Sequence, residues 1–217
     1  RPIKVAGFNT AVPGIAADVL DGQGNAVVGA LGELAITKPF VGMTQGFWGE
    51  SKRYLDTYWN QFADVWVQGD SAMREPDGHW LLVGRSDDTI KVAGKRIGPA
   101  EIEAVAIENG AVAQAAAIAV PHKIKGSAIV LFVTERSGGE TSPGDLLGEL
   151  STAVSRALGK SLAPEAVHVV EDLPHTRNGK ILRRLIRSTY LGEKAGDTSS
   201  LENPEALKFI ADLRSEE

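Results

Sequence analysis

The chain has 217 residues, 43% of them hydrophobic and 24% charged, and its 23 basic and 28 acidic side chains leave a formal net charge of −5. This composition is that of a globular protein and excludes a disordered or fibrous chain. No apolar run reaches the ~18 residues that a membrane-spanning helix needs, and the negative charge argues against a general nucleic-acid binder. The sequence contains no cysteine, which excludes disulfides and thiolate metal sites and fits a cytoplasmic protein.

Residues 1–86 are predicted to form a β-rich unit. Apolar runs bounded by glycine, proline and aspartate turns indicate strands, and only one segment of this unit has helical spacing of its apolar side chains. The predicted strands cover residues 15–20, 31–36, 65–67 and 79–83, and the predicted helix covers residues 50–61.

Residues 87–192 are predicted to form a second, α+β unit. Pro99 and Gly110 mark the start and end of one helix, and Pro143 and Gly159 those of another that Ser142 can cap. Helices and strands alternate in a way that predicts helices packed on a short mixed sheet. The remaining elements are apolar strands at 115–120, 128–133 and 166–170, and a basic amphipathic helix at 180–191.

The polar segment that begins at Glu193 is predicted to be a C-terminal tail, residues 193–217. Its glycine, serine and threonine residues are typical of a mobile linker. A last short helix is predicted over residues 204–213.

Three stretches have a composition suited to chemistry, and each also has a plain structural interpretation. Asp70, which follows Gly69 at the end of a strand, can bind two vicinal hydroxyls as carboxylates bind ribose, or it can cap its own turn. Residues 84–98 combine glycines with ionisable side chains, a pattern typical of a phosphate site or of a solvated linker. Asp87 and Asp88 fall where the two units meet, and therefore fit a hinge as well as a catalytic pair.

The third stretch places Lys180 just after the turn signal Asn178-Gly179, at the tip of a loop that enters a helix. A lysine in this position can stabilise negative charge on a phosphate or carboxylate under attack, although a basic helix start is also common on a protein surface. Nucleic-acid binding by this basic segment is disfavoured, because the segment lacks exposed aromatic side chains for stacking.

Several other chemistries find no support. The histidines are isolated and have no metal-ligand partner three or four residues away. Neither the Gly-x-Ser-x-Gly nucleophile elbow nor the Gly-x-x-x-x-Gly-Lys-[Ser/Thr] phosphate loop occurs in the sequence.

Taken in order, these stretches resemble the adenylate-forming superfamily of acyl-CoA synthetases, peptide-synthetase adenylation domains and luciferases. The resemblance rests on Gly69-Asp70, on Gly84-Arg85-x-Asp87-Asp88-x-Ile90-Lys91, on Gly94-x-Arg96-x-Gly98-x-x-Glu101-Ile102-Glu103, and on Thr176-Arg-Asn-Gly-Lys180. Ala93-Gly-Lys-Arg-Ile-Gly98 and Ile118-Ala-Val-Pro-His-Lys-Ile-Lys-Gly126 are similar to the acetyl-CoA synthetase branch. The resemblance implies that residues 1–86 are the last β-rich subdomain of the large adenylation domain and that residues 87–192 are the mobile C-terminal domain.

The resemblance also implies a role for each matching residue. Asp70 would hold the ATP ribose, Arg85 and Arg96 would contact the nucleotide, and Asp87 would be the hinge. Lys180 would be the adenylation lysine and a target for a lysine acetyltransferase and deacetylase. The positions implied for coenzyme A are Ala93 and Gly94 in its tunnel and Arg156 in the later helix.

One departure concerns a metal. The structural metal site of the acetyl branch would fall at Ile107, Asn109 and Val112, and Asn109 stands where that branch has histidine. No metal is therefore assigned to these residues.

The function that this resemblance implies is that of an AMP-forming short-chain acyl-CoA synthetase, which uses a small carboxylic acid, ATP, Mg²⁺ and coenzyme A. The family's phosphate loop and acyl pocket lie upstream of the motifs found here, so the chain alone is not expected to complete a turnover. An adenylation domain that serves a carrier protein and a non-catalytic interaction module are the alternatives. No membrane or nucleic-acid partner is expected.

Overall fold

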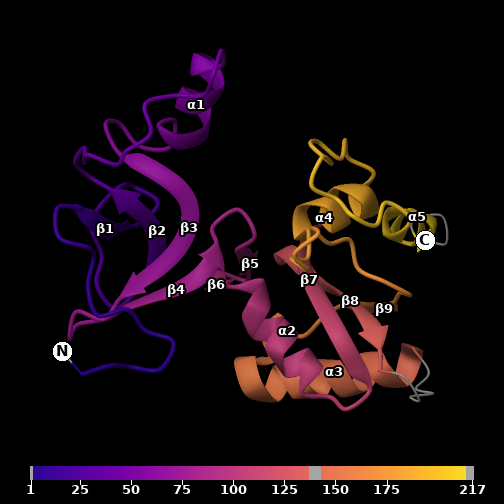
Figure 1. The fold of residues 1–217 in the computed structure, drawn as a ribbon. Coiled ribbons are helices and arrows are strands. Elements are labelled where there is room, and N and C mark those ends of the chain that lie inside the picture. The colour runs from indigo at the N-terminus through magenta and orange to yellow at the C-terminus, as the bar shows by residue number, and fades with distance from the viewer. Residues whose placement is uncertain (1, 137–142, 214–217) are drawn as a thin grey trace. The chain divides into compact units, whose positions relative to one another are not determined.

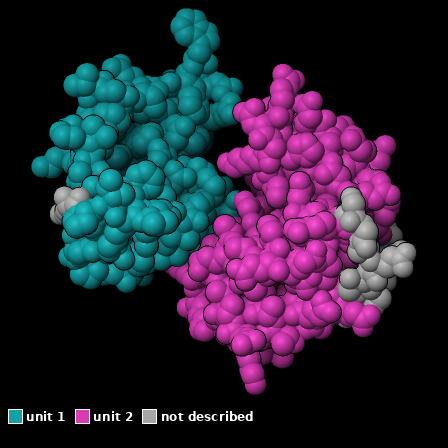
Figure 2. All heavy atoms as spheres, turned by 60° about the horizontal axis from the view of Figure 1, so that its bottom comes forward, with its two compact units in different colours: residues 1–89 teal, residues 90–217 magenta. Residues whose placement is uncertain are grey.

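The structure is a computed structural model that describes residues 2–136 and 143–213. The chain divides into two compact units, residues 1–89 and residues 90–217, coloured separately in Figure 2. The sequence predicts a boundary after residue 86, and the division in the structure falls after Thr89.

The first unit is built on an antiparallel sheet with the strand order β1-β2-β3-β4. Each predicted strand is present, and the helix is shorter than predicted. The elements are β1 (Ala17–Leu20), β2 (Leu31–Ile36), α1 (Ser51–Tyr58), β3 (Trp66–Arg74) and β4 (Trp80–Arg85).

Strand β3 continues well beyond its predicted end at Val67, as the long curved arrow in Figure 1 shows. It pairs with β2 on one edge and with β4 on the other. The pairing with β2 skips residues 68–70, where its register shifts, while Asp70 pairs with β4. Pairing on either side of this irregularity carries the strand through Gly69 and Asp70, residues that strand propensity disfavours. This extension places Asp70 directly opposite Arg85.

Apolar and aromatic side chains hold the first unit together. Leu20, Ala35 and Val67 form its small core, with Phe62 and Val65 packed against them. Helix α1 contacts β3 through aromatic rings, shown by the Tyr58 and Trp66 centroids, which are 5.2 Å apart.

The second unit is an α+β domain on a mixed sheet with the order β7-β8-β9. Strand β8 is antiparallel to β7 and parallel to β9, which confirms the predicted fold class. The elements are β5 (Ile90–Val92), β6 (Lys95–Ile97), α2 (Pro99–Ile107), β7 (Val112–His122), β8 (Gly126–Glu135), α3 (Pro143–Leu158), a 3₁₀ turn (Lys160–Leu162), β9 (Ala166–Val169), α4 (Arg183–Leu191) and α5 (Ala206–Leu213).

Helices cover both faces of this sheet (Figure 1). Side chains on one face of β7 and β8 join the core beneath α2 and α3. The alternate side chains, Ala116, Ile118, Val130 and Phe132 among them, join the core beneath α4 and α5. Because both faces are buried, the two strands read as continuous apolar runs instead of alternating ones.

Three local expectations differ from the structure. The β5–β6 hairpin was not predicted, and the helix predicted from Lys180 begins at Arg183. The predicted last helix is present as α5, but the segment before it is not a mobile linker, because Leu201 pairs with Thr176 and the buried Asn203 accepts a hydrogen bond from the His175 N–H. Ser142, the predicted cap of α3, lies outside the described residues.

None of the helices within residues 2–136 and 143–213 combines the length and apolarity needed to cross a lipid bilayer.

Candidate active site

The first group of candidate residues surrounds Arg85 in the first unit. Its guanidinium donates a hydrogen bond to the Gln68 carbonyl oxygen (2.7 Å) and another to Asp87 Oδ1 (3.1 Å). Asp70 Oδ1 lies 3.5 Å from the same side chain. Burial tends to lower the pKa of Arg85, but the hydrogen bond to Asp87 and the nearby carboxylate charges outweigh it and raise the pKa. The structure thus brings Asp70, Arg85 and Asp87 together.

Gly69 makes this arrangement possible. Its φ of +82° lies in the left-handed region, which glycine adopts without steric cost. A Cβ at this position would lie 2.6 Å from an Arg85 guanidinium nitrogen. The dipeptide Gly69-Asp70 therefore provides both a carboxylate and the space for the arginine beside it.

Residues 86–89 are fastened to the sheet of the first unit. The Ser86 backbone N–H donates to the Gly69 carbonyl (2.9 Å), and its hydroxyl donates to the buried carboxylate of Glu33 (2.9 Å). The Thr89 hydroxyl lies 3.1 Å from the Ser71 hydroxyl. Asp87, the predicted hinge residue, is 61% exposed at its side chain and precedes the division between the units by two residues.

The predicted coenzyme A residues Ala93 and Gly94 form the turn of the β5–β6 hairpin. Val92 pairs with Lys95 across a two-residue loop, and φ is positive at both Ala93 (+49°) and Gly94 (+80°), as a type I′ turn requires. Both residues are exposed, and no heavy atom lies within 4 Å of a Cβ built on Gly94. The tip is therefore open backbone that a ligand can approach closely. The exposed Arg96 lies on β6, opposite Lys91.

The side chain that follows this hairpin tip reaches the end of α3. The Lys95 ammonium is 3.2 Å from the position that a Cβ would take on Gly159. Arg156, the third predicted coenzyme A residue, lies one turn earlier on α3, in an open hollow that it shares with Ser151, Thr152, Ser155 and Lys160. Hydroxyl and cationic groups in one hollow suit a phosphate group.

Lys180 lies on a short, ordered loop of the second unit. The Thr176 N–H donates to the Lys180 carbonyl (2.9 Å), and the Lys180 N–H donates to the Thr176 hydroxyl (3.2 Å). The turn closes through a hydrogen bond from the Gly179 N–H to the Thr176 carbonyl (2.7 Å). Gly179 has a φ of +75°, which the Asn-Gly turn signal anticipates. The backbone of Lys180 is fixed while its side chain is exposed.

A buried ion pair fixes the helix that follows this loop. Arg183 donates hydrogen bonds from Nε to Glu103 Oε1 (2.6 Å) and from a terminal nitrogen to Glu103 Oε2 (2.5 Å). The Ala117 N–H also donates to Glu103 Oε1 (2.9 Å). Glu103 is 5% exposed, so these partners take the place of water around its carboxylate. One carboxylate on α2 thereby joins β7 to the first residue of α4.

The residues that the resemblance suggested for a structural metal do not fit one. Asn109 uses its side-chain amide to donate to Glu149 (2.9 Å), and its side-chain oxygen accepts from the Ala111 N–H (3.0 Å). Its backbone carbonyl accepts from the Val112 N–H (3.1 Å). Asn109 thus acts as a structural turn residue after α2, and no metal role is derived for it, Ile107 or Val112.

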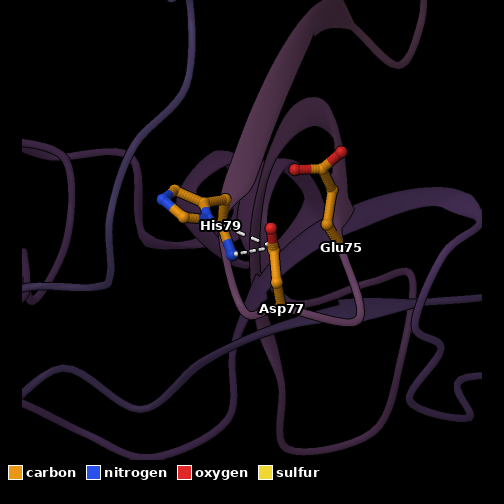
Figure 3. A group of neighbouring side chains, drawn as sticks. All are labelled: Glu75, Asp77 and His79. Carbon is orange, nitrogen blue, oxygen red and sulfur yellow. Dashed lines mark hydrogen bonds and ion pairs between the residues drawn. The ribbon is translucent and has the colours of Figure 1, made fainter. Parts of the chain in front are cut away.

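A different group, in the first unit, resembles a metal site in its composition. Glu75, Asp77 and His79 surround the β3–β4 turn, with potential ligand atoms within 4.8 Å of one another (Figure 3). The Lys4 ammonium lies 2.6 Å from both carboxylates, and its hydrogen bond holds the pKa of Asp77 far below its usual value. The Lys4 ammonium therefore supplies the positive charge that a metal ion would supply.

The structure also identifies positioning residues that the sequence analysis missed. Glu33, Glu103 and Asn203 are buried polar side chains with specific hydrogen-bond partners. Each bonds a segment distant in sequence, so local composition carries no signal for the pairing. Of the three, Glu103 alone lies in a sequence motif, Glu101-Ile102-Glu103, that could have indicated its importance.

Comparison with known proteins identifies the class to which this geometry belongs. Residues 101–180, which run from α2 to the exposed lysine, match the family described as the AMP-binding enzyme C-terminal domain. This part of the chain is thus the C-terminal domain of an AMP-binding enzyme.

Over most of its length the chain is similar to the C-terminal portion of acetyl-CoA synthetases. The chain is 39% identical over 216 residues to the acetyl-coenzyme A synthetase of Methanothrix soehngenii, with 96% of this chain and 32% of that protein covered. It is 38% identical over 200 residues to that of Escherichia coli K12, with 91% and 30% covered. Its fold matches acetoacetyl-CoA synthetase from Streptomyces lividans with a TM-score of 0.87 at 24% identity, over 99% of this chain and 33% of that chain. The chain spans about a third of the length of these relatives and corresponds to their C-terminal portion.

Proposed function

We propose that the protein to which this chain belongs is an AMP-forming, short-chain acyl-CoA synthetase. A carboxylate would attack the α-phosphate of ATP to give an acyl-adenylate and pyrophosphate. Coenzyme A would then displace AMP to give the thioester. The observation that carries the proposal is the exposed Lys180, held on an ordered loop at the end of the segment that matches the AMP-binding C-terminal domain.

The proposal gives Lys180 the role of the cation in the first step. Two anions meet when a carboxylate attacks ATP, so a positive charge aimed at the reacting oxygens lowers the barrier. Within the described residues, no carboxylate lies within ion-pair distance of the Lys180 ammonium. Its charge is therefore available to a substrate, and ATP would enter as its Mg²⁺ complex.

The Asp70–Arg85 group supports a nucleotide site. Asp70 would accept hydrogen bonds from the ribose hydroxyls, and Arg85, held by Gln68 and Asp87, would keep that carboxylate in place and contact the nucleotide. Arg96 would contact phosphate from strand β6. Carboxylates commonly bind ribose hydroxyls, and guanidinium groups commonly bind phosphates.

The hairpin tip and the α3 hollow support a coenzyme A site. A thioester-forming enzyme must admit the long pantetheine arm, and the open backbone at Ala93 and Gly94 would line its path. Arg156 would bind a phosphate of the same ligand. Between the two steps, the C-terminal domain would rotate about Asp87. This rotation would withdraw Lys180 from the reacting groups and bring in the hairpin, so that one cleft serves both reactions.

Loss of the Lys180 charge would also provide regulation. The side chain is exposed and therefore accessible to a lysine acetyltransferase and a deacetylase. Acetylation would remove the charge and block the first step while leaving the second intact.

The test is to replace Lys180 in the full-length protein and to measure the two half-reactions separately. In Lys180→Ala, we expect carboxylate-dependent ATP–pyrophosphate exchange to fall by about 10²-fold or more, while thioester formation from supplied acyl-adenylate persists. Lys194→Ala, at an exposed lysine of the same unit, is the control and should retain both activities. Full exchange activity in Lys180→Ala would overturn the proposed role.

The choice of acyl acceptor separates this proposal from its rival within the family. A short-chain acyl-CoA synthetase should release AMP in proportion to added coenzyme A. An adenylation domain that serves a carrier protein should release AMP only when that protein is supplied.

A further inference from the structure

The lysine loop, defined here as residues 172–182, lies against a segment from near the C-terminus. That segment, residues 198–206, is called the strap below. In Figure 1 it belongs to the yellow part of the chain between α4 and α5. The sequence predicts a mobile linker that leads into the last helix, but in the structure this segment bonds to the lysine loop at several points.

The lysine loop is by itself a very small hairpin. Its two limbs meet through the bridge between His175 and Ile181 and the hydrogen bond from the Leu182 N–H to the Pro174 carbonyl (2.8 Å). Two strands this short are only marginally stable in water. A further strand is the usual means of fixing such a hairpin.

The strap supplies a short backbone pairing in place of such a strand. Thr176 forms an antiparallel bridge with Leu201, and the Glu202 N–H donates to the His175 carbonyl (3.0 Å). Thr176 is also the residue whose backbone and hydroxyl bond to Lys180. Only one residue, Thr176, therefore separates the strap from the backbone of Lys180.

Asn203 is the central residue of this contact. It is 6% exposed, its side-chain oxygen accepts from the His175 N–H (3.0 Å), and its amide donates to Asp172 Oδ2 (2.6 Å) and to the Leu173 carbonyl (3.0 Å). An asparagine side chain offers both a donor and an acceptor, and Asn203 uses both on the limb that leads to Lys180. No apolar or singly functional side chain can make all three bonds.

The strap is anchored at both of its ends. On one side, Arg184 of α4 donates to the Asp197 carbonyl (2.8 Å). On the other, the strap runs into α5, whose Ala206 is fully buried and whose Ile210 belongs to the core beneath α4. Contacts with α4 and with the core of the second unit thus hold the strap at both ends, and the strap in turn can restrict the movement of the lysine loop.

We propose that the strap is a positioning element for Lys180 and that Asn203 is the positioning residue at its centre. The inference rests on the proposed role of Lys180 in adenylation. A displacement of about 1 Å can cost about 10²-fold in rate, so a loop that must present an ammonium to a phosphate gains from the support of a third segment. Among the described residues, no hydrogen bond joins the strap to the β5–β6 hairpin, so the thioester-forming step should not depend on the strap.

The experiment combines kinetics with hydrogen exchange on three variants. Asn203→Ala removes all three side-chain bonds. Asn203→Asp keeps the shape and the acceptor for His175 but cannot donate to Asp172 or Leu173. Glu205→Ala changes an exposed strap residue and is the matched control.

In the full-length protein, we expect Asn203→Ala and Asn203→Asp to lower carboxylate-dependent ATP–pyrophosphate exchange by about tenfold to a hundredfold. Thioester formation from supplied acyl-adenylate should stay within about twofold, and Glu205→Ala should retain both activities. In the 217-residue chain, amide exchange across residues 172–182 should accelerate in both Asn203 variants, while that of β7 and β8 should not change.

The outcomes separate this proposal from the proposed function. The strap proposal would be overturned if amide hydrogen exchange in the lysine loop were unchanged in the Asn203 variants, or if both half-reactions fell equally. This holds even where Lys180→Ala abolishes adenylation. Conversely, full adenylation activity in Lys180→Ala would overturn the role proposed for Lys180. The strap would then have no role in adenylation, whatever the amide exchange rates of the lysine loop. Asn203→Asp keeps the test decisive if the alanine variant does not fold.

Discussion

Gly69 shows how a single residue can decide the geometry of a site. A Cβ there would collide with the Arg85 guanidinium, and the backbone is in the left-handed region. The backbone conformation thus favours glycine, and any Cβ would also push the end of the Arg85 side chain out of its place. The sequence points to this dipeptide through Asp70, whereas the reason for the glycine before it becomes visible only with Arg85 in place.

At the residue scale we predict that Gly69→Ala destabilises the first unit and displaces Arg85. The left-handed conformation alone costs about 1–2 kcal/mol for a non-glycine residue, and the collision adds to it. Gly14→Ala is the matched control, because Gly14 has a similar φ of +90° with no heavy atom within 4 Å of its built Cβ. Urea unfolding followed by tryptophan fluorescence should give a larger loss for Gly69→Ala; equal losses would contradict a role for Arg85.

At the scale of elements, the loop around Lys180 depends on contacts from both sides. The strap holds the limb before the lysine, and the Glu103–Arg183 pair holds the helix after it. Neither partner lies near Lys180 in the sequence. Secondary-structure patterns place the turn at Asn178-Gly179, but they cannot indicate which distant segments fix it.

We predict that Arg183→Met costs about 3–5 kcal/mol of unfolding free energy, because it leaves the buried Glu103 carboxylate without its cation. The double variant Glu103→Gln/Arg183→Met should recover much of this loss, because glutamine keeps an acceptor for the Ala117 N–H and carries no charge. Chemical denaturation of the unaltered protein, the two single variants and the double variant measures the coupling free energy between the two side chains. Additive losses would show that the two side chains act independently.

The β5–β6 hairpin illustrates why an element can be missed. Its strands have three residues each, too few for a pattern to stand out, and Ala93 occupies a turn position where asparagine, aspartate or glycine is usual. What stabilises the hairpin is tertiary burial, since Ile90 and Val92 are almost fully buried in the core shared with α2 and α3. The local sequence alone therefore does not indicate that these residues form a stable hairpin.

At the scale of the whole molecule, the chain consists of two units with separate cores. The contacts within residues 90–217 include both faces of the β7-β8-β9 sheet. Residues 86–89, in contrast, bond to Glu33, Gly69 and Ser71 of the first unit. The hinge predicted at Asp87 thus lies in a segment that belongs structurally to the first unit.

We predict that a fragment of residues 90–217 folds on its own and unfolds cooperatively. A longer fragment that begins at residue 87 should be equally stable, because residues 87–89 contact the other unit. A shorter fragment that begins at residue 99 should lose about 5 kcal/mol, since it lacks the buried side chains of Ile90, Val92 and Ile97. Circular dichroism during thermal unfolding compares the three; equal stability of all three would refute the packing role of the hairpin.

The sequence by itself determined the two-unit organisation, the α+β class of the second unit, most of the helices and strands, and the motifs that mark an adenylate-forming enzyme. These features follow from local signals, namely apolar periodicity, turn residues and short motifs. Tertiary structure alone decided that β3 extends through Asp70, that a hairpin presents Ala93 and Gly94, and that the residues after Glu193 hold the lysine loop. Each of these depends on hydrogen bonds or burial between segments far apart in the chain, and no local pattern of residue types encodes such a pairing.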